Sequence, residues 1–178
     1  ITEKKFQVDK IYESDVSDGE IQICTSKFNE IVKHLTRFDK ICNIKNTRYR
    51  QRNDIYTLFG FIKDNHNLSP DTLDYFYKLL LQFDKVISPS KLTCKPFAEY
   101  AFNCVSQSNS STARQARINI LNELLLNRES EPTEFQHQVI EFYHPTGNAL
   151  KKIDKFLTFD IDSLSKAIDK KIEEEEKA

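Results

Sequence analysis

Apolar residues recur at steps of three and four along most of the chain, the spacing of one buried face of an α-helix. In the stretch 26–42, seven apolar side chains follow this spacing: Phe28, Ile31, Val32, Leu35, Phe38, Ile41 and Cys42. Similar patterns predict further helices over about 53–65, 70–87, 96–105, 112–127, 132–144, 146–157 and after residue 162. We therefore predict a mainly α fold, a multi-helix bundle of seven to eight helices that holds more than half of the chain.

Local signals mark where several of these predicted helices begin and end. Ser26 and Ser69 are placed to cap free backbone N–H groups, and Pro70 fits the first helical position after Ser69. Pro89 and Pro145 predict helix ends, because the residue before a proline is disfavoured in helical conformation. The loops between these segments are short, so neighbouring helices should pack antiparallel.

The first 25 residues have a different pattern. Their apolar residues are scattered among Asp, Glu and Ser, and Gly19 is a turn signal. We predict a short strand pair or an extended arm over 1–25, with any strand of the chain confined to this region. The helical domain then spans 26–160, and 161–178 forms a C-terminal amphipathic helix with an acidic tail.

Composition limits the classes of protein. The chain has 178 residues, 39% of them hydrophobic and 30% charged, which is enough for one domain with its own core. The apolar runs fall short of the roughly 20 residues that a membrane-spanning helix needs. A formal net charge of −1 argues against a protein that coats nucleic acid through overall positive charge. Only three glycines make a glycine-rich nucleotide loop improbable.

The four cysteines, Cys24, Cys42, Cys94 and Cys104, form no C-x-x-C pair. The alternative is a zinc site built from Cys94, Cys104, His137 and His144, but those spacings match no familiar zinc-finger pattern. We interpret all four cysteines as reduced thiols of a cytoplasmic protein, and we expect no metal and no cofactor.

A basic segment is the first candidate binding feature. Between 40 and 52 the chain carries five basic residues, one aromatic residue and no acid: Lys40, Lys45, Arg48, Tyr49, Arg50 and Arg52. Forked guanidinium donors at the start of a helix suit a phosphate, and the tyrosine could stack. The alternative is a solvated basic face that makes ordinary ion pairs.

Two further arginines form the second candidate. On a helical projection, Arg114 and Arg117 fall within the apolar stripe of the predicted helix 112–127. A guanidinium there must find a partner, since an unpaired buried charge is costly. We expect Arg114 to be mostly buried. One interpretation is an Arg–Asp bridge between two helices, with Asp54 as the acid; the other is an anion site formed with the basic segment.

Signatures of common active sites are absent. The chain has no G-x-S-x-G, H-E-x-x-H, G-x-x-x-x-G-K-[ST] or G-x-G-x-x-G sequence. We therefore assign no catalytic residue and expect that this chain by itself is not an enzyme.

Two arginine-centred stretches carry a family resemblance. They read N-T-R-Y-R-Q-R-N-D-I-Y-T-L-F over 46–59 and S-T-A-R-Q-A-R-I-N-I-L over 111–121. The region 28–127 resembles the helical C-terminal half of the conserved domain of GmrSD-type bacterial restriction and anti-phage proteins. In that family a ParB/sulfiredoxin-like part with a D-G-Q-Q-R motif precedes this half, and many members end in an HNH nuclease. This chain has neither feature, so the resemblance implies a helical subdomain whose catalytic neighbours are missing.

The leading hypothesis is a non-catalytic helical module of a DNA-restriction or anti-phage protein. Its partners would be DNA, contacted weakly at the backbone, and the flanking domains of a longer parent protein, with no membrane involved. The residues expected to contact phosphate are Lys45, Arg48, Tyr49, Arg50, Arg52, Arg114 and Arg117. The alternative is a helical protein–protein interaction domain in which both arginine groups are structural, and an unrecognised enzyme ranks third.

Overall fold

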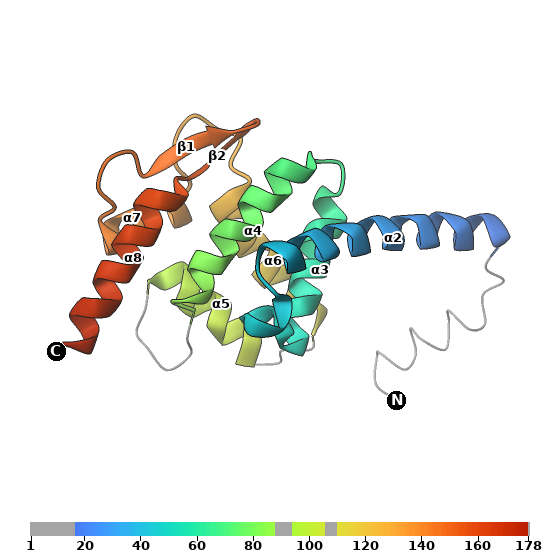
Figure 1. Cartoon of the computed structure of the whole chain (residues 1–178), viewed down its shortest axis with the longest axis horizontal. Coiled ribbons are helices and arrows are strands. Elements are labelled where there is room, and N and C mark those ends of the chain that lie inside the picture. Colours follow the sequence, from blue (N-terminus) through green and yellow to red (C-terminus); the bar gives the residue numbers. More distant parts are fainter. Residues whose placement is uncertain (1–16, 88–93, 106–109, 178) are drawn as a thin grey trace.

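The computed structural model describes residues 17–87, 94–105 and 110–177, and within these ranges the chain is mainly helical (Figure 1). Seven α-helices are present there: α2 (Asp18–Ile41), α3 (Arg52–Asn65), α4 (Pro70–Asp84), α5 (Lys95–Val105), α6 (Ser111–Leu125), α7 (Glu134–Tyr143) and α8 (Ile161–Glu176). Two 3-10 turns, η1 (Ile44–Asn46) and η2 (Arg48–Arg50), join α2 to α3. Strands β1 (Leu150–Ile153) and β2 (Phe156–Phe159) form a small antiparallel hairpin before α8. The prediction of a mainly α bundle is confirmed.

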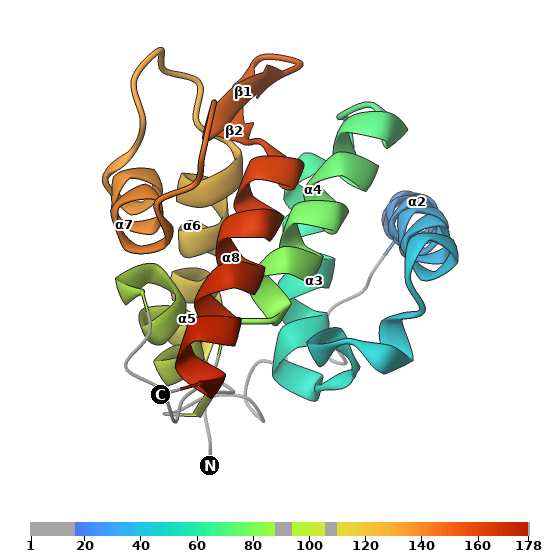
Figure 2. The ribbon, with the colours of Figure 1, turned by 60° about the vertical axis from the view of Figure 1, so that its left-hand side comes forward.

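Helix α4 is the centre of the bundle. It contacts α2 and α8, and Figures 1 and 2 show it running between these two helices. Two of its phenylalanines each meet two aromatic rings from other elements: Phe76 meets Phe61 and Phe156, and Phe83 meets Phe97 and Phe159. These rings are buried, so α4 joins α3, α5 and the hairpin into one apolar core.

A buried glutamine ties α6, α7 and the hairpin together. The Gln136 amide donates to the carbonyls of Leu124 at 3.0 Å and Leu157 at 2.9 Å. Its oxygen accepts from Asn127 Nδ2 at 2.9 Å and from the Thr133 backbone N–H at 3.0 Å. Gln136 is fully buried, and both its amide nitrogen and its amide oxygen form hydrogen bonds, as the polar atoms of a side chain inside a core must.

The first helix begins earlier than predicted. Ser17 and Glu20 form a capping box, and α2 starts at Asp18 rather than at Ser26. The prediction of a strand pair or extended arm is therefore wrong for 17–25, and 1–16 lie outside the described residues. The apolar spacing that begins at Phe28 continues backwards through Cys24 and Ile21, which outweighs the turn signal of Gly19.

The predicted helix over 146–157 is also wrong, because this segment forms the hairpin. Leu150, Ile153 and Leu157 have helical spacing, but they lie on two strands, with Ile153 opposite Phe156. The two-residue connection begins at Asp154, whose φ of 55° is one that aspartate tolerates better than most residues. Both described strands thus lie near the C-terminal end of the chain, so the prediction that confined any strand to the first 25 residues is wrong.

The other helix predictions agree with the structure to within a few residues at each end. Ser69 caps α4 and Thr133 caps α7, and each accepts from the backbone N–H three residues on. Helix α4 ends at Asp84, while Pro89, predicted to end it, lies outside the described residues. Helix α8 adds Leu164 and Ile168 to the core of the bundle.

Candidate functional site

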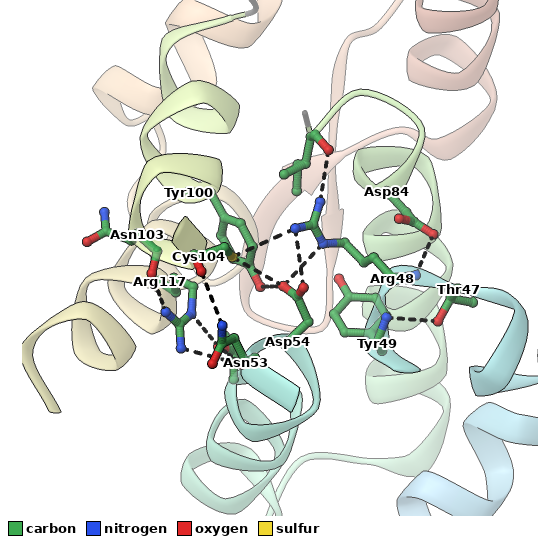
Figure 3. A network of polar contacts seen from close by, with 12 residues as sticks. Thr47, Arg48, Tyr49, Asn53, Asp54, Asp84, Tyr100, Asn103, Cys104 and Arg117 are labelled. Carbon is green, nitrogen blue, oxygen red and sulfur yellow. Dashed lines mark hydrogen bonds and ion pairs between the residues drawn. The ribbon is translucent and has the colours of Figure 1, made fainter. Parts of the chain in front are cut away.

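The basic segment and the start of α3 are folded around one buried carboxylate, as Figure 3 shows. Asp54, in the first turn of α3, is fully buried. Arg48 of η2 faces it, with Nε 3.1 Å from Oδ1 and an Nη 3.3 Å from Oδ2. The Tyr100 hydroxyl of α5 donates to Oδ1 at 2.9 Å. This carboxylate therefore holds η2, α3 and α5 together.

Electrostatics favour a charged guanidinium on Arg48 at this position. Burial alone would lower the pKa of the Arg48 guanidinium, but the charge and hydrogen bond of Asp54 hold it above its ordinary value. Burial raises the pKa of Tyr100 well above its ordinary value, so the hydroxyl stays protonated and keeps donating. Burial, together with the Asp54 charge, raises the pKa of the nearby Cys104 thiol to about 11. Such a thiol is a poor nucleophile near neutral pH.

Arg48 and Arg117 also donate to backbone carbonyl groups, one just beyond the end of α4 and one in the last turn of α5. Arg48 donates to the Ile87 carbonyl at 3.0 Å, three residues beyond the end of α4. Arg117 of α6 donates to the Asn103 carbonyl in the last turn of α5 and to the Thr57 hydroxyl of α3 at 2.8 Å. Carbonyls in the last turn of a helix have no partner within that helix, and the helix dipole favours a cation there. Arg117 is almost completely buried, and it joins α3, α5 and α6.

The expectation for Arg114 is wrong. Arg114 is exposed, whereas Arg117, one turn further along the same helix, is the buried arginine of α6. Asp54, proposed as the acid of an Arg–Asp bridge to α6, pairs instead with Arg48. Tyr49 is buried against Tyr77, with ring centroids 6.3 Å apart.

The structure separates the predicted phosphate-binding residues into different surroundings. Arg48 and Arg50 line a polar cleft of about 500 Å³, together with Asp84 and Cys104. Burial raises the pKa of Asp84, and the Arg48 backbone N–H, 3.2 Å from its carboxylate, opposes that shift. The remaining cations among the predicted residues are exposed: Lys45, Arg50, Arg52 and Arg114.

Arg52 and Arg114 meet at one exposed aromatic ring. The Arg52 guanidinium carbon lies 5.9 Å from the ring centroid of Tyr56, and that of Arg114 lies 5.6 Å from it. Arg52 and Tyr56 are four residues apart on α3, and Arg114 comes from the first turn of α6. We call Arg52 and Arg114 the arginine pair.

An apolar groove of about 630 Å³ lies beside this ring, and we call it the α2–α3–α6 groove. Its apolar lining comes from three helices: Phe28 of α2, Ile55, Tyr56 and Phe59 of α3, and Ile118 of α6. Lys63, Asp64 and Arg114 are the charged residues of its lining. The Phe28 and Phe59 rings are in contact, with centroids 5.9 Å apart, so α2 closes one side of the groove.

Gly60 of α3 leaves room under this groove for the end of the Ile118 side chain of α6. A Cβ atom at this position would lie 2.7 Å from Ile118 Cδ1, closer than side chains tolerate. Glycine therefore lets Ile118 pack directly on the α3 backbone. Sequence reasoning missed this groove. Two features of the sequence could have indicated it: Gly60, one of only three glycines, lies within a predicted helix, and Tyr56 follows Arg52 by four residues.

The apolar surface continues from the groove along α2. Ile21 and Cys24 lie on the same helix face as Phe28, at steps of three and four residues, and all three are exposed. In Figure 1 this end of α2 projects beyond the other helices. Exposed contiguous apolar surface of this kind is typical of an interaction site.

Within 17–87, 94–105 and 110–177, no group of three or more His, Cys, Asp or Glu side chains could hold a metal ion. No helix in those ranges has both the length and the apolar character needed to cross a membrane. Comparison of the chain with models of known protein families, with curated proteins and with solved structures gives no match.

Proposed function

We propose that the chain is a helical protein-interaction module that binds a helical segment of a partner protein in the α2–α3–α6 groove. The observation that carries this proposal is the apolar lining of the groove beside a well-formed core: Phe28 and Tyr56 are exposed, and Ile55 and Phe59 are half-buried. An amphipathic helix that lays its apolar face into such a groove is a common mode of recognition. The exposed face of α2 lengthens the available surface beyond what a small ligand would cover.

The arginine network supports an interaction module over a phosphate-binding one. Arg48 and Arg117 are both used inside the bundle, by the Asp54 carboxylate and by carbonyls at helix ends. Neither side chain can turn outward to a phosphate without breaking those contacts. This favours the interpretation in which a large part of the arginine signal is structural.

The resemblance to GmrSD-type proteins supports the proposal that the parent protein acts in DNA restriction or defence against phage. Its two stretches, 46–59 and 111–121, supply Arg48, Asp54 and Arg117, which fix the packing of α3, α5 and α6. We therefore propose that this module belongs to a cytoplasmic DNA-restriction or anti-phage protein and binds a helix of a flanking domain or of a partner subunit.

Selection of helical peptides from a displayed random library against the intact chain tests the docking proposal. Selected peptides should lose binding on Phe28→Glu, which places a charge at the groove. They should keep binding to the Phe102→Glu variant. Phe102 is also an exposed phenylalanine, at 65% against 54% for Phe28, but it lies on α5, outside the groove lining. Peptides that bind both variants equally, or a library that yields none, would overturn the proposal.

A second candidate function, contact with nucleic-acid phosphates, is favoured by the exposure of Lys45, Arg50, Arg52 and Arg114. The N-cap residue of α3, Gln51, makes no side-chain capping hydrogen bond, so its side chain does not occupy the N–H groups beside Arg50 and Arg52.

Titration of labelled duplex DNA at several salt concentrations tests this second candidate. The triple variant Arg50→Ala/Arg52→Ala/Arg114→Ala should reduce the slope of log affinity against log salt by ~0.9 for each lost contact. A control that replaces three exposed lysines of the hairpin and α8, Lys152→Ala/Lys155→Ala/Lys166→Ala, should leave the slope unchanged. Equal slopes for both variants would exclude this function for the arginines. Arg48 is left intact because its loss would disturb the fold.

A further inference from the structure

The arginine pair is held at the rim of the α2–α3–α6 groove by Tyr56. Tyr56 and Arg114 both line the groove, and the Arg52 guanidinium lies over the same tyrosine ring. An arginine that stacks on an aromatic face keeps its N–H donors at the edge of the guanidinium plane, where they can still reach a ligand. Both side chains are exposed, so a ligand seated in the groove can reach them.

The charged residues of the groove lining together with Arg52 sum to a positive charge, although the chain as a whole has a formal charge of −1. Lys63 and Asp64, also in the lining, form an ion pair at 3.7 Å and largely cancel each other. The arginine pair then remains as the net charge beside the apolar floor. A ligand that complements this site must bring apolar groups and negative charge together.

We propose that the groove selects an acidic amphipathic helix, whose apolar stripe fills the groove and whose Asp or Glu carboxylate binds between Arg52 and Arg114. This inference rests on the proposed function and adds the chemistry of the partner. Apolar anchors at positions i, i+3 or i+4 and i+7 would contact Phe28, Ile55 and Phe59. A carboxylate at the edge of that stripe would receive forked guanidinium hydrogen bonds.

A helix with a carboxylate fits this site better than the backbone of nucleic acid does. A duplex presents its phosphates on a convex surface, and phosphate contacts alone leave the apolar floor of the groove uncovered. A helix covers the floor and supplies the anion in one rigid element. Nucleic acid is therefore the competing outcome of the test.

Three synthetic helical peptides test the inference, and all three share the apolar stripe of one peptide selected from the library. They carry Glu, Gln or Lys at the position that flanks the stripe, and their affinity for the intact chain is measured by fluorescence anisotropy. The Gln peptide should bind about tenfold more weakly than the Glu peptide, as expected when a carboxylate loses two partly exposed arginine partners. The Lys peptide should bind more weakly still, and the preference for Glu should decrease as salt is added.

A charge exchange supplies the second arm. Arg52→Glu/Arg114→Glu should reverse the preference, so that the Lys peptide binds more tightly than the Glu peptide. Arg128→Glu is the matched control, because Arg128 is also an exposed arginine over an aromatic ring, 5.7 Å from Phe156, and it lies outside the groove lining. Circular dichroism confirms that each variant keeps its helicity.

The outcomes distinguish this inference from the proposed function. If all three peptides bind equally well, the groove binds helices but the arginine pair does not select an acid, and the inference is wrong. If no peptide of any charge binds, the proposed function fails first. Displacement of the Glu peptide by duplex DNA at physiological salt, with loss of that competition in the double Arg→Glu variant, would assign the pair to phosphate and overturn the inference.

Discussion

Arg117→Ala is the perturbation that tests the interior most directly, because Arg117 joins three helices through one side chain. Its guanidinium satisfies the Asn103 carbonyl near the end of α5 and the Thr57 hydroxyl of α3, and a third donor lies 3.4 Å from the Asn53 carbonyl. Truncation leaves these acceptors in a buried space and opens a cavity of almost a whole arginine side chain.

The expected cost of Arg117→Ala is about 3 kcal/mol. Each buried acceptor left without a donor costs roughly 1–3 kcal/mol, and water that enters the cavity recovers part of that loss. For a domain of this length, that cost lowers the melting temperature by about 6–12 °C. Arg114→Ala is the matched control on the same helix: Arg114 is exposed, its described contact is the Tyr56 ring, and its loss should cost less than about 1 kcal/mol.

Urea unfolding followed by circular dichroism at 222 nm measures both variants against the wild type. Arg117→Lys extends the series, because lysine keeps the charge but cannot reach several acceptors at once, so its stability should fall between those of wild type and Arg117→Ala. The same order should appear in thermal melts. A cost below about 1 kcal/mol for Arg117→Ala, or equal costs for Arg114→Ala and Arg117→Ala, would refute the assignment of Arg117 as a link between helices.

Three further outcomes follow from the structure. Gln136→Leu should destabilise the chain by about 3 kcal/mol in urea unfolding, because four hydrogen bonds of the buried Gln136 side chain are lost. Asp160→Ala, which removes the N-cap of α8, should cost about 1 kcal/mol of stability at pH 7 and less at pH 3. The Lys151 hydrogen bond lowers the pKa of Asp160 in the folded chain. The stabilisation by this carboxylate is therefore present above the unfolded-state pKa and is lost as pH falls through the folded-state pKa. Iodoacetamide at pH 8, followed by mass spectrometry, should label exposed Cys24 well before Cys104, whose pKa burial raises to about 11.

Helical periodicity predicted most of the fold because the core stripes of these helices are long and their caps are local. Ser69 before Pro70 specified the start of α4 without any tertiary information. The same reasoning did not predict the hairpin. Its strands have four residues each, which is too short to distinguish the two-residue hydrophobic period of a strand from the 3.6-residue period of a helix. Its core residues, Phe156 and Phe159, are recognised only once α4 supplies the rings that they pack against.

The arginines of α6 show why the candidate site was harder to predict than the helices. A helical projection gives the direction of a side chain around the axis, and it placed Arg114 and Arg117 on nearly the same face. It carries no information on where neighbouring helices begin and end along that axis. Arg117 faces the ends of α3 and α5 and is buried, whereas Arg114, one turn earlier, lies at an open rim.

The arginine-centred stretches, the most distinctive features of this sequence, therefore supply side chains that are not accessible to a ligand. Arg48 and Asp54 from one stretch, and Arg117 from the other, are tied into the interior, and their spacing is dictated by which helix ends they reach. The surface that remains free to bind is made of ordinary residues: an exposed tyrosine, a helical glycine and the apolar side of α2. Arginines that are tied into the interior in this way give little information about a ligand. Evidence for the ligand must come from Arg52, Tyr56 and Arg114, where the fold leaves charge and apolar surface exposed side by side.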